Sequence, residues 1–461
     1  MALIKSISGI RGTIGGFAGD NLTPQDLVEC AAAFGYWSKQ QTGNNRVVIG
    51  RDGRISGEVV SQLVSATLRM VGCDVIDLGL STTPTVEMAV PELDAGAGII
   101  LTASHNPKQW NALKFLNGKG EFISAQQGRD VLALIDENAI EYVGVDALGS
   151  YEFQEGYIEK HIDHILQLEL VNAERVRERK FKVVVDAVNS TGALSLPPLL
   201  EALGCDVVLL NGEITGQFAH NPEPLPANLT GLSQAVEREN ADLGIAVDPD
   251  VDRLALVCEN GEMFGEEYTL VAVADYILSK KGGNTVSNLS STRALRDVTE
   301  KHGGTYTAAA VGEVNVVEAM KANDAIIGGE GNGGIIYPEL HYGRDALVGV
   351  ALILTYLAEY GKPLSFLKRS YPQYTISKNK IELTDDIDLD RLFDKLSLKY
   401  QQQPQNDIDG LKIEFDTDWI HLRRSNTEPI VRIYTESTSE VIAENLATKI
   451  KADINEVLKG A

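Results

Sequence analysis

The sequence predicts an α/β protein with three related mixed α/β domains, whose sheets are largely parallel, and a smaller C-terminal α+β domain around a central cleft. Three observations predict this fold class. The chain has 461 residues, enough for about three domains and perhaps four. A unit of strand, polar loop, helix and second strand recurs three times before about residue 371, and such alternation is typical of parallel sheets. The rest of the chain departs from that unit.

The three units can be read directly from the apolar runs. The first runs through residues 46–52 to 72–76, the second through 182–187 to 204–208, and the third, which is fainter, through 284–288 to 303–306. The second strand of each unit follows a Gly. A chance likeness among α/β units is the alternative to a true repeat. We predict domains at 1–145, 150–257, 258–370 and 375–461.

Each unit has a third strand, and chemically active residues follow it. The strand at 97–101 leads into Thr102-Ala103-Ser104-His105-Asn106-Pro107, the strand at 243–247 into Asp248-Pro249-Asp250-Val251-Asp252-Arg253, and the strand at 325–328 into a Gly-rich loop at 329–334. Ligands in open α/β sheets gather at the carboxyl ends of strands. We therefore expect the three loops to face one shared cleft.

Asp248, Asp250 and Asp252 are the most informative residues of the chain. In extended backbone, alternate residues face the same way, so three carboxylates would repel one another without a cation. Oxygen ligands of this kind suit Mg²⁺. An EF-hand loop is disfavoured because Arg253 stands where that loop needs Gly. A solvated acidic turn is the other alternative.

The segment from 375 to the end is predicted to be the smaller α+β domain. Residues 419–422 and 430–434 have the apolar character of strands. Between them lie Arg423, Ser425, Asn426 and Thr427, which can offer several hydrogen-bond donors to a phosphate. A turn that binds no ligand is the alternative. We expect a hinge near 370–374.

Composition excludes several classes of partner. The formal net charge is −24, which argues against nucleic-acid and anionic-membrane partners. The four cysteines form no C-x-x-C pair, and no segment has the roughly 20 apolar residues of a membrane span. The N-terminus lacks the long apolar core of a signal peptide. We expect a cytoplasmic protein.

Five motifs, taken together and in this order, resemble those of the α-D-phosphohexomutase family. They are Ser8-Gly9-Ile10-Arg11-Gly12, Thr102 to Pro107, Asp248 to Arg253, Gly329-Glu330-Gly331-Asn332-Gly333, and Arg423 to Thr427. The resemblance spans nearly the whole chain. It implies four domains around a cleft and an enzyme that interconverts hexose 1-phosphate and 6-phosphate. It also implies a phosphoserine, matched by Ser104, and a hexose 1,6-bisphosphate intermediate.

The resemblance also implies roles for single residues. The Ser104 phosphate with Asp248, Asp250 and Asp252 would hold Mg²⁺. Lys114 matches a general acid/base, and Arg11, His105 and Arg253 match nearby electrostatic positions. The sugar would meet the Gly-rich loop and a second specificity loop, at Gly312, Glu313, Glu330 and Asn332. The phosphate would meet the C-terminal loop and strand, at Arg423, Ser425, Asn426, Thr427 and Arg432.

Substrate choice is predicted from Glu428-Pro429, which look more like the phosphoglucosamine mutases, and from the second specificity loop, which lacks the basic residue of many glucose or mannose enzymes. Two departures in the Gly-rich loop mean instead that a general-base role for a His there cannot be carried over. Asn332 stands where the commoner bacterial pattern has Ser, and Gly334 where it has His. Glu313 and Glu330 would favour an ammonium-bearing sugar, so glucosamine phosphate is the first expectation. Phosphoglucomutase or phosphomannomutase activity is the alternative, followed by a sugar phosphatase and by a non-catalytic sugar-phosphate binding protein.

Overall fold

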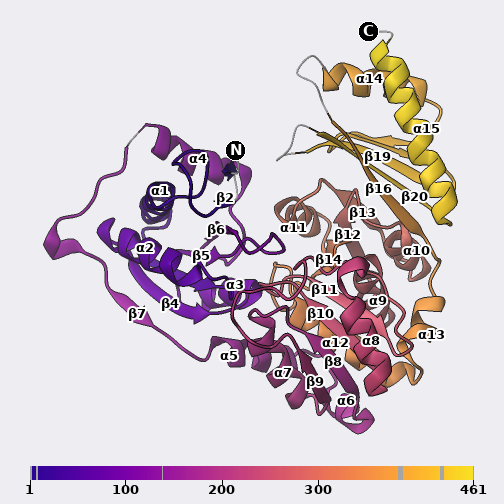
Figure 1. The fold of residues 1–461 in the computed structure, drawn as a ribbon, viewed down its shortest axis with the longest axis horizontal. Coiled ribbons are helices and arrows are strands. Elements are labelled where there is room, and N and C mark those ends of the chain that lie inside the picture. Colours follow the sequence, from indigo (N-terminus) through magenta and orange to yellow (C-terminus); the bar gives the residue numbers. More distant parts are fainter. Residues whose placement is uncertain (1–2, 7–8, 138, 383–387, 426–429, 460–461) are drawn as a thin grey trace.

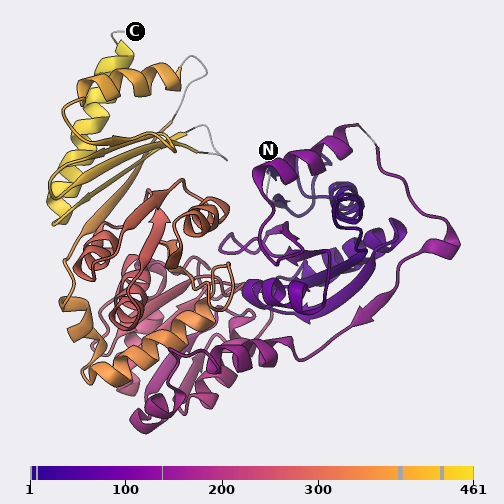
Figure 2. The ribbon, with the colours of Figure 1, turned by 180° about the vertical axis from the view of Figure 1, so that it is seen from behind.

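The computed structural model describes residues 3–6, 9–137, 139–382, 388–425 and 430–459, and these residues form four β-sheets with helices against them. Figure 1 shows the N-terminal part of the chain beside the central part, and the C-terminal part at one end of the central part. The view from behind shows the same arrangement (Figure 2).

The first sheet has seven strands in the order β1-β2-β6-β5-β3-β4-β7. Its strands are β1 (Ile4–Ser6), β2 (Gly9–Thr13), β3 (Arg46–Arg51), β4 (Asp74–Leu80), β5 (Ala97–Leu101), β6 (Trp110–Asn117) and β7 (Tyr151–Phe153). Its helices are α1 (Pro24–Thr42), α2 (Gly57–Met70), α3 (Thr83–Glu92) and α4 (Ala125–Asp136), and a 3₁₀ turn lies at Val145–Ala147. Val47 and Ile49 pack on the side of α1 and α2, whereas Val48 packs on the side of α3. Alternation along β3 thus buries both faces of the sheet.

Strand β7 lies in the range that we predicted for the second domain, yet it pairs in parallel with β4 of the first sheet. All three of its residues are exposed. A strand this short, with no buried face, has no alternating apolar pattern by which the sequence could reveal it. The division into four residue ranges therefore stays a prediction.

The second and third sheets each have four strands. The second contains β8 (Lys182–Asp186), β9 (Asp206–Leu210), β10 (Leu243–Val247) and β11 (Leu254–Cys258), with helices α5 (Tyr157–Leu166), α6 (Ala173–Arg179), α7 (Gly192–Ala202) and α8 (Thr230–Glu239) and a 3₁₀ turn at Pro226–Asn228. The third contains β12 (Asn284–Asn288), β13 (Tyr306–Ala309), β14 (Ala325–Glu330) and β15 (Gly334–Ile336), with helices α9 (Glu266–Lys280), α10 (Ala294–Lys301), α11 (Glu313–Ala322), α12 (Ala346–Tyr360) and α13 (Leu364–Arg369).

The predicted repeat is visible in the strand order. A central strand, β3, β8 or β12, lies between two parallel neighbours in each of these sheets. A fourth strand then returns antiparallel to the second neighbour, as β6, β11 or β15. The three loops that carry the predicted site residues all join the third strand to the fourth. They therefore start at equivalent carboxyl ends, where ligands of open sheets gather.

The fourth sheet is antiparallel throughout, in the order β16-β20-β19-β18-β17. Its elements are β16 (Thr375–Glu382), α14 (Leu389–Lys399), β17 (Gln405–Asn406), β18 (Leu411–Glu414), β19 (Trp419–Arg424), β20 (Ile430–Ser437) and α15 (Glu440–Lys459). The helices come between or after the strands in sequence, as in α+β domains. The predicted fold class of three mixed α/β domains and one α+β domain is confirmed.

The hydrophobic cores show which sheets are joined. One cluster contains Val183 and Leu243 from the second sheet together with Val271 of α9 and Leu352 of α12. The second and third sheets therefore share a core. The first and fourth sheets have clusters of their own.

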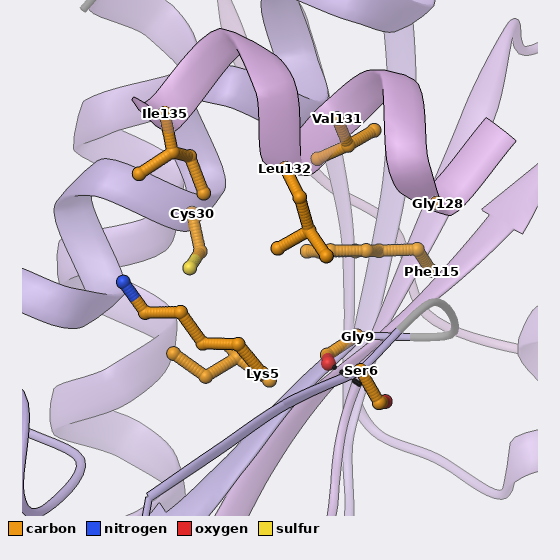
Figure 3. Close-up of a pocket in the computed structure, with 10 residues that line it drawn as sticks. Lys5, Ser6, Gly9, Cys30, Phe115, Gly128, Val131, Leu132 and Ile135 are labelled. Carbon is orange, nitrogen blue, oxygen red and sulfur yellow. Dashed lines mark hydrogen bonds between the residues drawn. The ribbon is translucent and has the colours of Figure 1, made fainter. Parts of the chain in front are cut away.

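A small cavity lies inside the N-terminal part of the chain, between the β1–β2 hairpin, α1 and α4 (Figure 3). Cys30, Phe115, Val131 and Ile135 line it with apolar groups, and Lys5 enters from one side. This lining lacks the carboxylates that the predicted chemistry needs. Among the helices that the structure describes, none is long and apolar enough to cross a membrane.

Candidate active site

Ser104 follows β5 in a loop with an unusual backbone. Its φ is +48°, in the left-handed region that few residues other than glycine adopt. Strain of this kind persists only where the surroundings hold it in place, and it is concentrated at active sites. The buried guanidinium of Arg54 holds the loop by donating to the carbonyl oxygens of Ser104, Asn106, Pro107 and Trp110.

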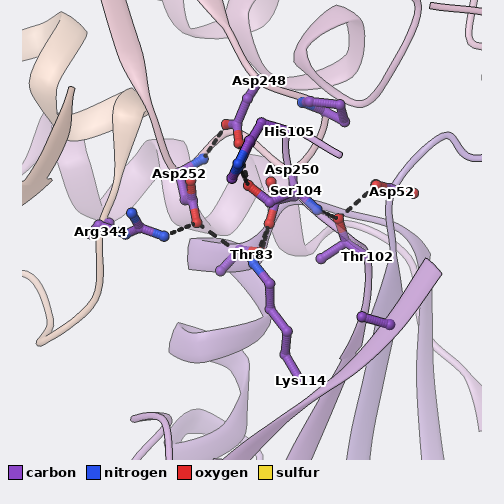
Figure 4. A network of polar contacts seen from close by, with 12 residues as sticks. Asp52, Thr83, Thr102, Ser104, His105, Lys114, Asp248, Asp250, Asp252 and Arg344 are labelled. Carbon is purple, nitrogen blue, oxygen red and sulfur yellow. Dashed lines mark hydrogen bonds and ion pairs between the residues drawn. The ribbon is translucent and has the colours of Figure 1, made fainter. Parts of the chain in front are cut away.

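Asp52 completes this support (Figure 4). It lies 3.0 Å from Arg54 Nε and accepts from Thr102 Oγ1 at 2.6 Å. Thr102 Oγ1 in turn accepts from the backbone N–H of Ser104 at 2.9 Å. The sequence prediction missed Arg54, although its position two residues after Asp52, at the end of the first predicted strand, was a usable signal.

The three predicted metal ligands converge in the loop between β10 and β11. Asp248, Asp250 and Asp252 are fully buried, and one oxygen of each lies within 4.8 Å of the others. Ser104 Oγ donates to Asp248 Oδ2 at 2.6 Å, so the predicted serine meets the triplet (Figure 4). Val251 within the loop has φ +64°, a second strained position.

The triplet fits a divalent cation. Oδ1 of Asp250 and Oδ1 of Asp252 are buried and have no hydrogen-bond partner among the described residues. A buried acceptor without a partner costs free energy. Oxygen ligands at such positions suit a hard divalent cation. Burial, and then the charges of Asp252 and Asp250, raise the pKa of Asp248 well above its usual value, which shows how strongly the three carboxylates repel one another.

Lys114 and Arg344 are the two cations that lie nearest to the triplet, and Arg253 Nε is 3.9 Å from Asp252 Oδ1. Lys114 on β6 places its Nζ 2.8 Å from Asp250 Oδ2 and 3.7 Å from Asp252 Oδ2. Burial opposes its charge, but the two carboxylates outweigh burial and raise the pKa of Lys114. Burial would raise the pKa of Asp250 too, yet Lys114 and hydrogen bonds, including one from Thr83 Oγ1 at 2.7 Å, lower it. Lys114 therefore holds its proton in this geometry.

The second cation is Arg344, which the sequence prediction missed. Its guanidinium donates to Asp252 at 2.6 Å, to Glu330 at 2.8 Å and to Glu313 at 3.0 Å. It thus links the Asp triplet to two predicted sugar-binding residues. Burial alone would lower the pKa of Arg344, but the charges of the carboxylates outweigh burial and raise this pKa. Nothing in the local sequence around an isolated arginine indicates such a role.

The glycine at position 334 leaves space for the side chain of Arg344. A Cβ at position 334 would lie 2.3 Å from Arg344 Cδ, so the absence of a side chain there makes room for the arginine. Asn332 is part of the same turn, where its Oδ1 accepts from the Gly334 N–H at 3.2 Å. The backbone N–H of Gly312 donates to Glu330 Oε1 at 3.2 Å. The predicted sugar-binding residues are therefore neighbours.

The predicted electrostatic residues lie beside Ser104. Arg11 on β2 donates to Asn106 Oδ1 at 3.3 Å, and the backbone N–H of Arg253 donates to Asp248 Oδ1 at 3.1 Å. Burial, and then the charge of Arg253, lower the pKa of Arg11, which indicates two guanidinium groups near each other. His105 Nδ1 lies 3.4 Å from Ser104 Oγ, and burial followed by Arg253 lowers the pKa of His105 to about 2. The imidazole is neutral and can serve as a hydrogen-bond partner.

The predicted phosphate residues of the C-terminal sheet form a separate group. Arg423 on β19 is paired in register with Arg432 on β20, and its Nε lies 3.2 Å from Asp409 Oδ2. The backbone N–H of Ser425 donates to the Ile430 carbonyl. Asn426 and Thr427 lie outside the described residues. Two arginines opposite each other on neighbouring strands repel, and an anion would relieve that repulsion.

Comparison with known proteins agrees with this fold. The chain matches the four domains of the phosphoglucomutase/phosphomannomutase family: α/β/α domain I over residues 3–141, domain II over 159–261, domain III over 265–374 and the C-terminal domain over 382–452. It is 36% identical to a phosphoglucomutase/phosphomannomutase of Thermococcus kodakarensis, with 97% of this chain and 99% of that protein covered.

Two further proteins are similar along nearly their whole length. A probable phosphoglucosamine mutase of Methanopyrus kandleri is 34% identical, with 95% of each chain covered. The crystal structure of a phosphoglucomutase/phosphomannomutase family protein from Burkholderia thailandensis has a TM-score of 0.85 at 27% identity, covering 99% of this chain and 98% of that one. The chain belongs to this family, the phosphohexomutases, and is a mutase, an isomerase that acts on phosphorylated hexoses.

Proposed function

We propose that the protein interconverts the 6-phosphate and 1-phosphate of glucosamine through a phosphoserine at Ser104 and a bisphosphorylated sugar intermediate. The hydrogen bond from Ser104 Oγ to Asp248 at 2.6 Å carries this proposal, because it places a strained serine against three buried carboxylates. A phosphoserine there would meet a cation held by Asp248, Asp250 and Asp252. We propose Mg²⁺ as that cation, and it would neutralise charge and polarise the transferring phosphoryl group.

The residues around Ser104 would transfer a proton and stabilise the charge of the phosphoryl group. The phosphoryl group passes from Ser104 Oγ to a free sugar hydroxyl, and Ser104 Oγ gains a proton as the sugar hydroxyl loses one. In the return step the other sugar phosphate passes to Ser104, whose hydroxyl loses a proton as the sugar oxygen gains one. Lys114, held in its charged form by Asp250 and Asp252, is suited to donate a proton to the sugar oxygen in the return step. Arg11 and Arg253 would stabilise the charge on the phosphoryl oxygens, and His105 would orient them.

The sugar ring would bind at the Gly-rich loop and the second specificity loop, and the distal phosphate would bind at the C-terminal sheet. Glu330, Asn332, Gly312 and Glu313 would contact the ring hydroxyls or the amino group. Arg423, Ser425 and Arg432, with the predicted Asn426 and Thr427, would hold the phosphate that is not reacting. The intermediate must then turn over, so that each of its phosphates meets Ser104 in turn.

Charge balance supports an amino sugar. Glu313 and Glu330 share the guanidinium of Arg344 with Asp252, which Lys114 also faces, so a negative excess is left at the two glutamates. An ammonium group on the sugar would reduce that excess. The Methanopyrus kandleri relative carries the name probable phosphoglucosamine mutase, which agrees with this proposal. The second candidate is a glucose or mannose enzyme, because the Thermococcus kodakarensis relative carries the name phosphoglucomutase/phosphomannomutase.

A phosphorus NMR time course tests the proposal. The protein, Mg²⁺ and a trace of hexose 1,6-bisphosphate are incubated with the 1-phosphates of glucosamine, glucose or mannose at equal concentration. We expect conversion to the 6-phosphate to be fastest with glucosamine. Faster conversion of glucose or mannose would favour the second candidate. Release of inorganic phosphate would indicate a phosphatase, and no reaction would indicate a binding protein.

A charge variant tests the basis of the preference. Glu313→Gln should lower kcat/KM for glucosamine phosphate about tenfold or more relative to glucose phosphate, the cost of one hydrogen bond to a charged group. Glu318→Gln is the matched control, because Glu318 lies on the same helix, α11, and is exposed. Equal losses on both sugars in Glu313→Gln would contradict the role of this carboxylate in selecting the sugar.

A further inference from the structure

A second group of metal-binding side chains lies outside the site described above. Among the described residues, His161, His341 and Asp345 form one of two clusters whose ligand atoms all lie within 4.8 Å of one another, and the Asp triplet is the other. His161 comes from α5, whereas His341 and Asp345 lie in the loop between β15 and α12. The cluster therefore joins the helix that precedes the second sheet to a loop that follows the third.

The two imidazoles converge on one oxygen. Asp345 Oδ2 lies 2.8 Å from His161 Nε2 and 3.3 Å from His341 Nε2. The other oxygen of Asp345, Oδ1, accepts from the backbone N–H groups of Leu347 and Val348 and so caps α12. Helix capping fixes the carboxylate, and Oδ2 remains directed at the two rings.

The outer nitrogen of each ring also faces an oxygen on α3. His161 Nδ1 lies 3.0 Å from Thr85 Oγ1, and His341 Nδ1 lies 3.4 Å from Glu87 Oε2. Histidines that bind metals usually have their second nitrogen held by a hydroxyl, carbonyl or carboxylate, which fixes the tautomer that offers the other nitrogen. The Thr85 hydroxyl meets this requirement for His161, and the Glu87 carboxylate lies 3.4 Å from the second nitrogen of His341 without a hydrogen bond to it.

Glu87 provides a second observation, separate from the three ligands. Its side chain is buried, at 2% exposure, and neither carboxylate oxygen has a hydrogen-bond partner among the described residues. Gly343 leaves room for it, because a Cβ at that position would lie 1.8 Å from Glu87 Oε2. An unpartnered buried carboxylate costs free energy that a nearby cation would offset.

We propose that His161 Nε2, His341 Nε2 and Asp345 Oδ2 bind a transition-metal ion of the Zn²⁺ class, with Thr85 and Glu87 as outer partners of the two rings. Imidazole nitrogen prefers such metals over Mg²⁺, which takes oxygen ligands. His341 and Glu87 also line a surface pocket together with His164 and Leu340, so one of the three ligands is reached from solvent, whereas His161 and Asp345 are buried.

A metal ion at this site would connect three parts of the chain. Its ligands and their partners come from α3 against the first sheet, from α5, and from the loop before α12. Arg344, the residue before Asp345, reaches Asp252 and both sugar-site carboxylates. A bound ion would stabilise the folded protein by mass action and hold this loop in place.

Cobalt binding to the full-length protein tests the site. Co²⁺ is added in the presence of excess Mg²⁺, which is meant to occupy the proposed site at the Asp triplet, and visible ligand-field absorption reports ligation by nitrogen. We expect one equivalent of Co²⁺ to bind the wild-type protein, and Zn²⁺ to displace it. Glu87→Gln should weaken binding by about 10–100-fold, the usual cost of losing an outer partner. His341→Ala should weaken it further, and His341→Gln serves if that variant does not fold.

His164→Ala is the matched control. His164 lines the same pocket, is half exposed and pairs with Glu92 at 2.6 Å, but it is not part of the cluster. We expect it to bind Co²⁺ as the wild type does, and circular dichroism checks that each variant is folded. The proposal is overturned if wild-type protein binds no Co²⁺ under excess Mg²⁺, if folded His341 variants bind it equally well, or if His164→Ala loses it to the same extent.

Discussion

Arg344 illustrates how one residue organises this site. Its guanidinium is buried and donates to carboxylates from the β10–β11 loop, α11 and β14. Removing one partner of a buried charge group leaves the others uncompensated, which is far more costly than losing a surface ion pair. The space that it fills exists because position 334 is glycine.

A double-mutant cycle tests this spatial coupling. Gly334→Ala should destabilise the wild-type protein by about 1–3 kcal/mol, because a methyl group must displace Arg344. In an Arg344→Ala background the obstacle is gone, so the same change should cost much less, with a coupling energy of about 0.5–3 kcal/mol. Urea denaturation of the four proteins gives the free energies of unfolding.

Gly231→Ala provides the control for the cycle. Gly231 lies in α8, where a Cβ would meet no atom within 4 Å, so its replacement should add to Arg344→Ala without coupling. Additive effects of Gly334→Ala and Arg344→Ala would show that the two positions do not compete for space.

Some site residues could be predicted from local sequence and others could not. Ser104 and the Asp triplet follow apolar strands directly, so their position at strand ends is visible in the pattern. Arg344 contacts Asp252 across 92 positions of the chain, and Arg54 contacts the Ser104 carbonyl across 50. Contacts of this kind depend on how domains and loops pack, and no local periodicity encodes them.

At the scale of elements, several short apolar strands were predictable, and the short exposed strand β7 was not. β3, β8 and β10 are short apolar runs that lie in the middle of sheets. β7 has no buried residue and was not predicted as a strand. Strand β19 adds a further feature, because a histidine within it lies at the boundary between two domains.

That histidine, His421, is almost completely buried and is hydrogen-bonded as a neutral ring. Its Nε2 donates to the Asp409 carbonyl at 2.7 Å, and its Nδ1 lies 3.0 Å from Ser290 Oγ of the third domain. Burial lowers its pKa to about 4, with the charges of Lys412 and Arg423 acting in the same direction. The imidazole of His421 is therefore harder to protonate in the folded protein than in the unfolded chain.

This difference predicts how stability depends on pH. Between about pH 6.5 and about pH 4 the unfolded state binds a proton that the folded state does not, so stability falls as pH falls. The loss from this group should reach about 2 kcal/mol between about pH 7 and about pH 5. His421→Gln should remove it. Urea denaturation is followed by the fluorescence of Trp419, in a background where the other tryptophans are Phe.

His164→Gln is the control for the pH series, because His164 is half exposed. It should keep the wild-type pH dependence. An unchanged slope in His421→Gln would show that the buried imidazole does not govern acid sensitivity of the C-terminal domain.

At the scale of the whole molecule, the domains are joined in two different ways. The second and third sheets share one hydrophobic core. The C-terminal domain instead meets the third through polar contacts, among them Arg296 with Glu414 at 2.6 Å and Lys412 Nζ with the Leu289 carbonyl at 2.8 Å. Polar interfaces of this kind permit relative motion.

The predicted hinge at 370–374 lies in the segment that connects the third domain to the C-terminal domain. Tyr268 Oη donates to the Pro372 carbonyl and accepts from the Tyr374 N–H, each at 2.7 Å, so the segment is anchored to α9. We therefore expect any rotation to begin at the end of this segment, where β16 starts.

Small-angle scattering tests closure of the C-terminal domain. Hexose 1,6-bisphosphate should lower the radius of gyration, because its distal phosphate would draw the Arg423–Arg432 pair toward the other site residues. Arg423→Ala should reduce the contraction, whereas Arg391→Ala, an exposed arginine of the same domain on α14, should not. Identical profiles with and without the bisphosphate would contradict a closing motion.

The central claim is that Ser104 donates a phosphoryl group to the sugar. The most direct measurement labels the protein with hexose 1,6-bisphosphate that carries radioactive phosphorus, locates the label by peptide mapping, and then adds unlabelled hexosamine 6-phosphate with Mg²⁺. The account predicts label on Ser104, its transfer to the sugar bisphosphate and then to monophosphate, and no labelling of Ser104→Ala. Label on another residue, its release as inorganic phosphate without sugar, or full mutase activity in Ser104→Ala would contradict the account.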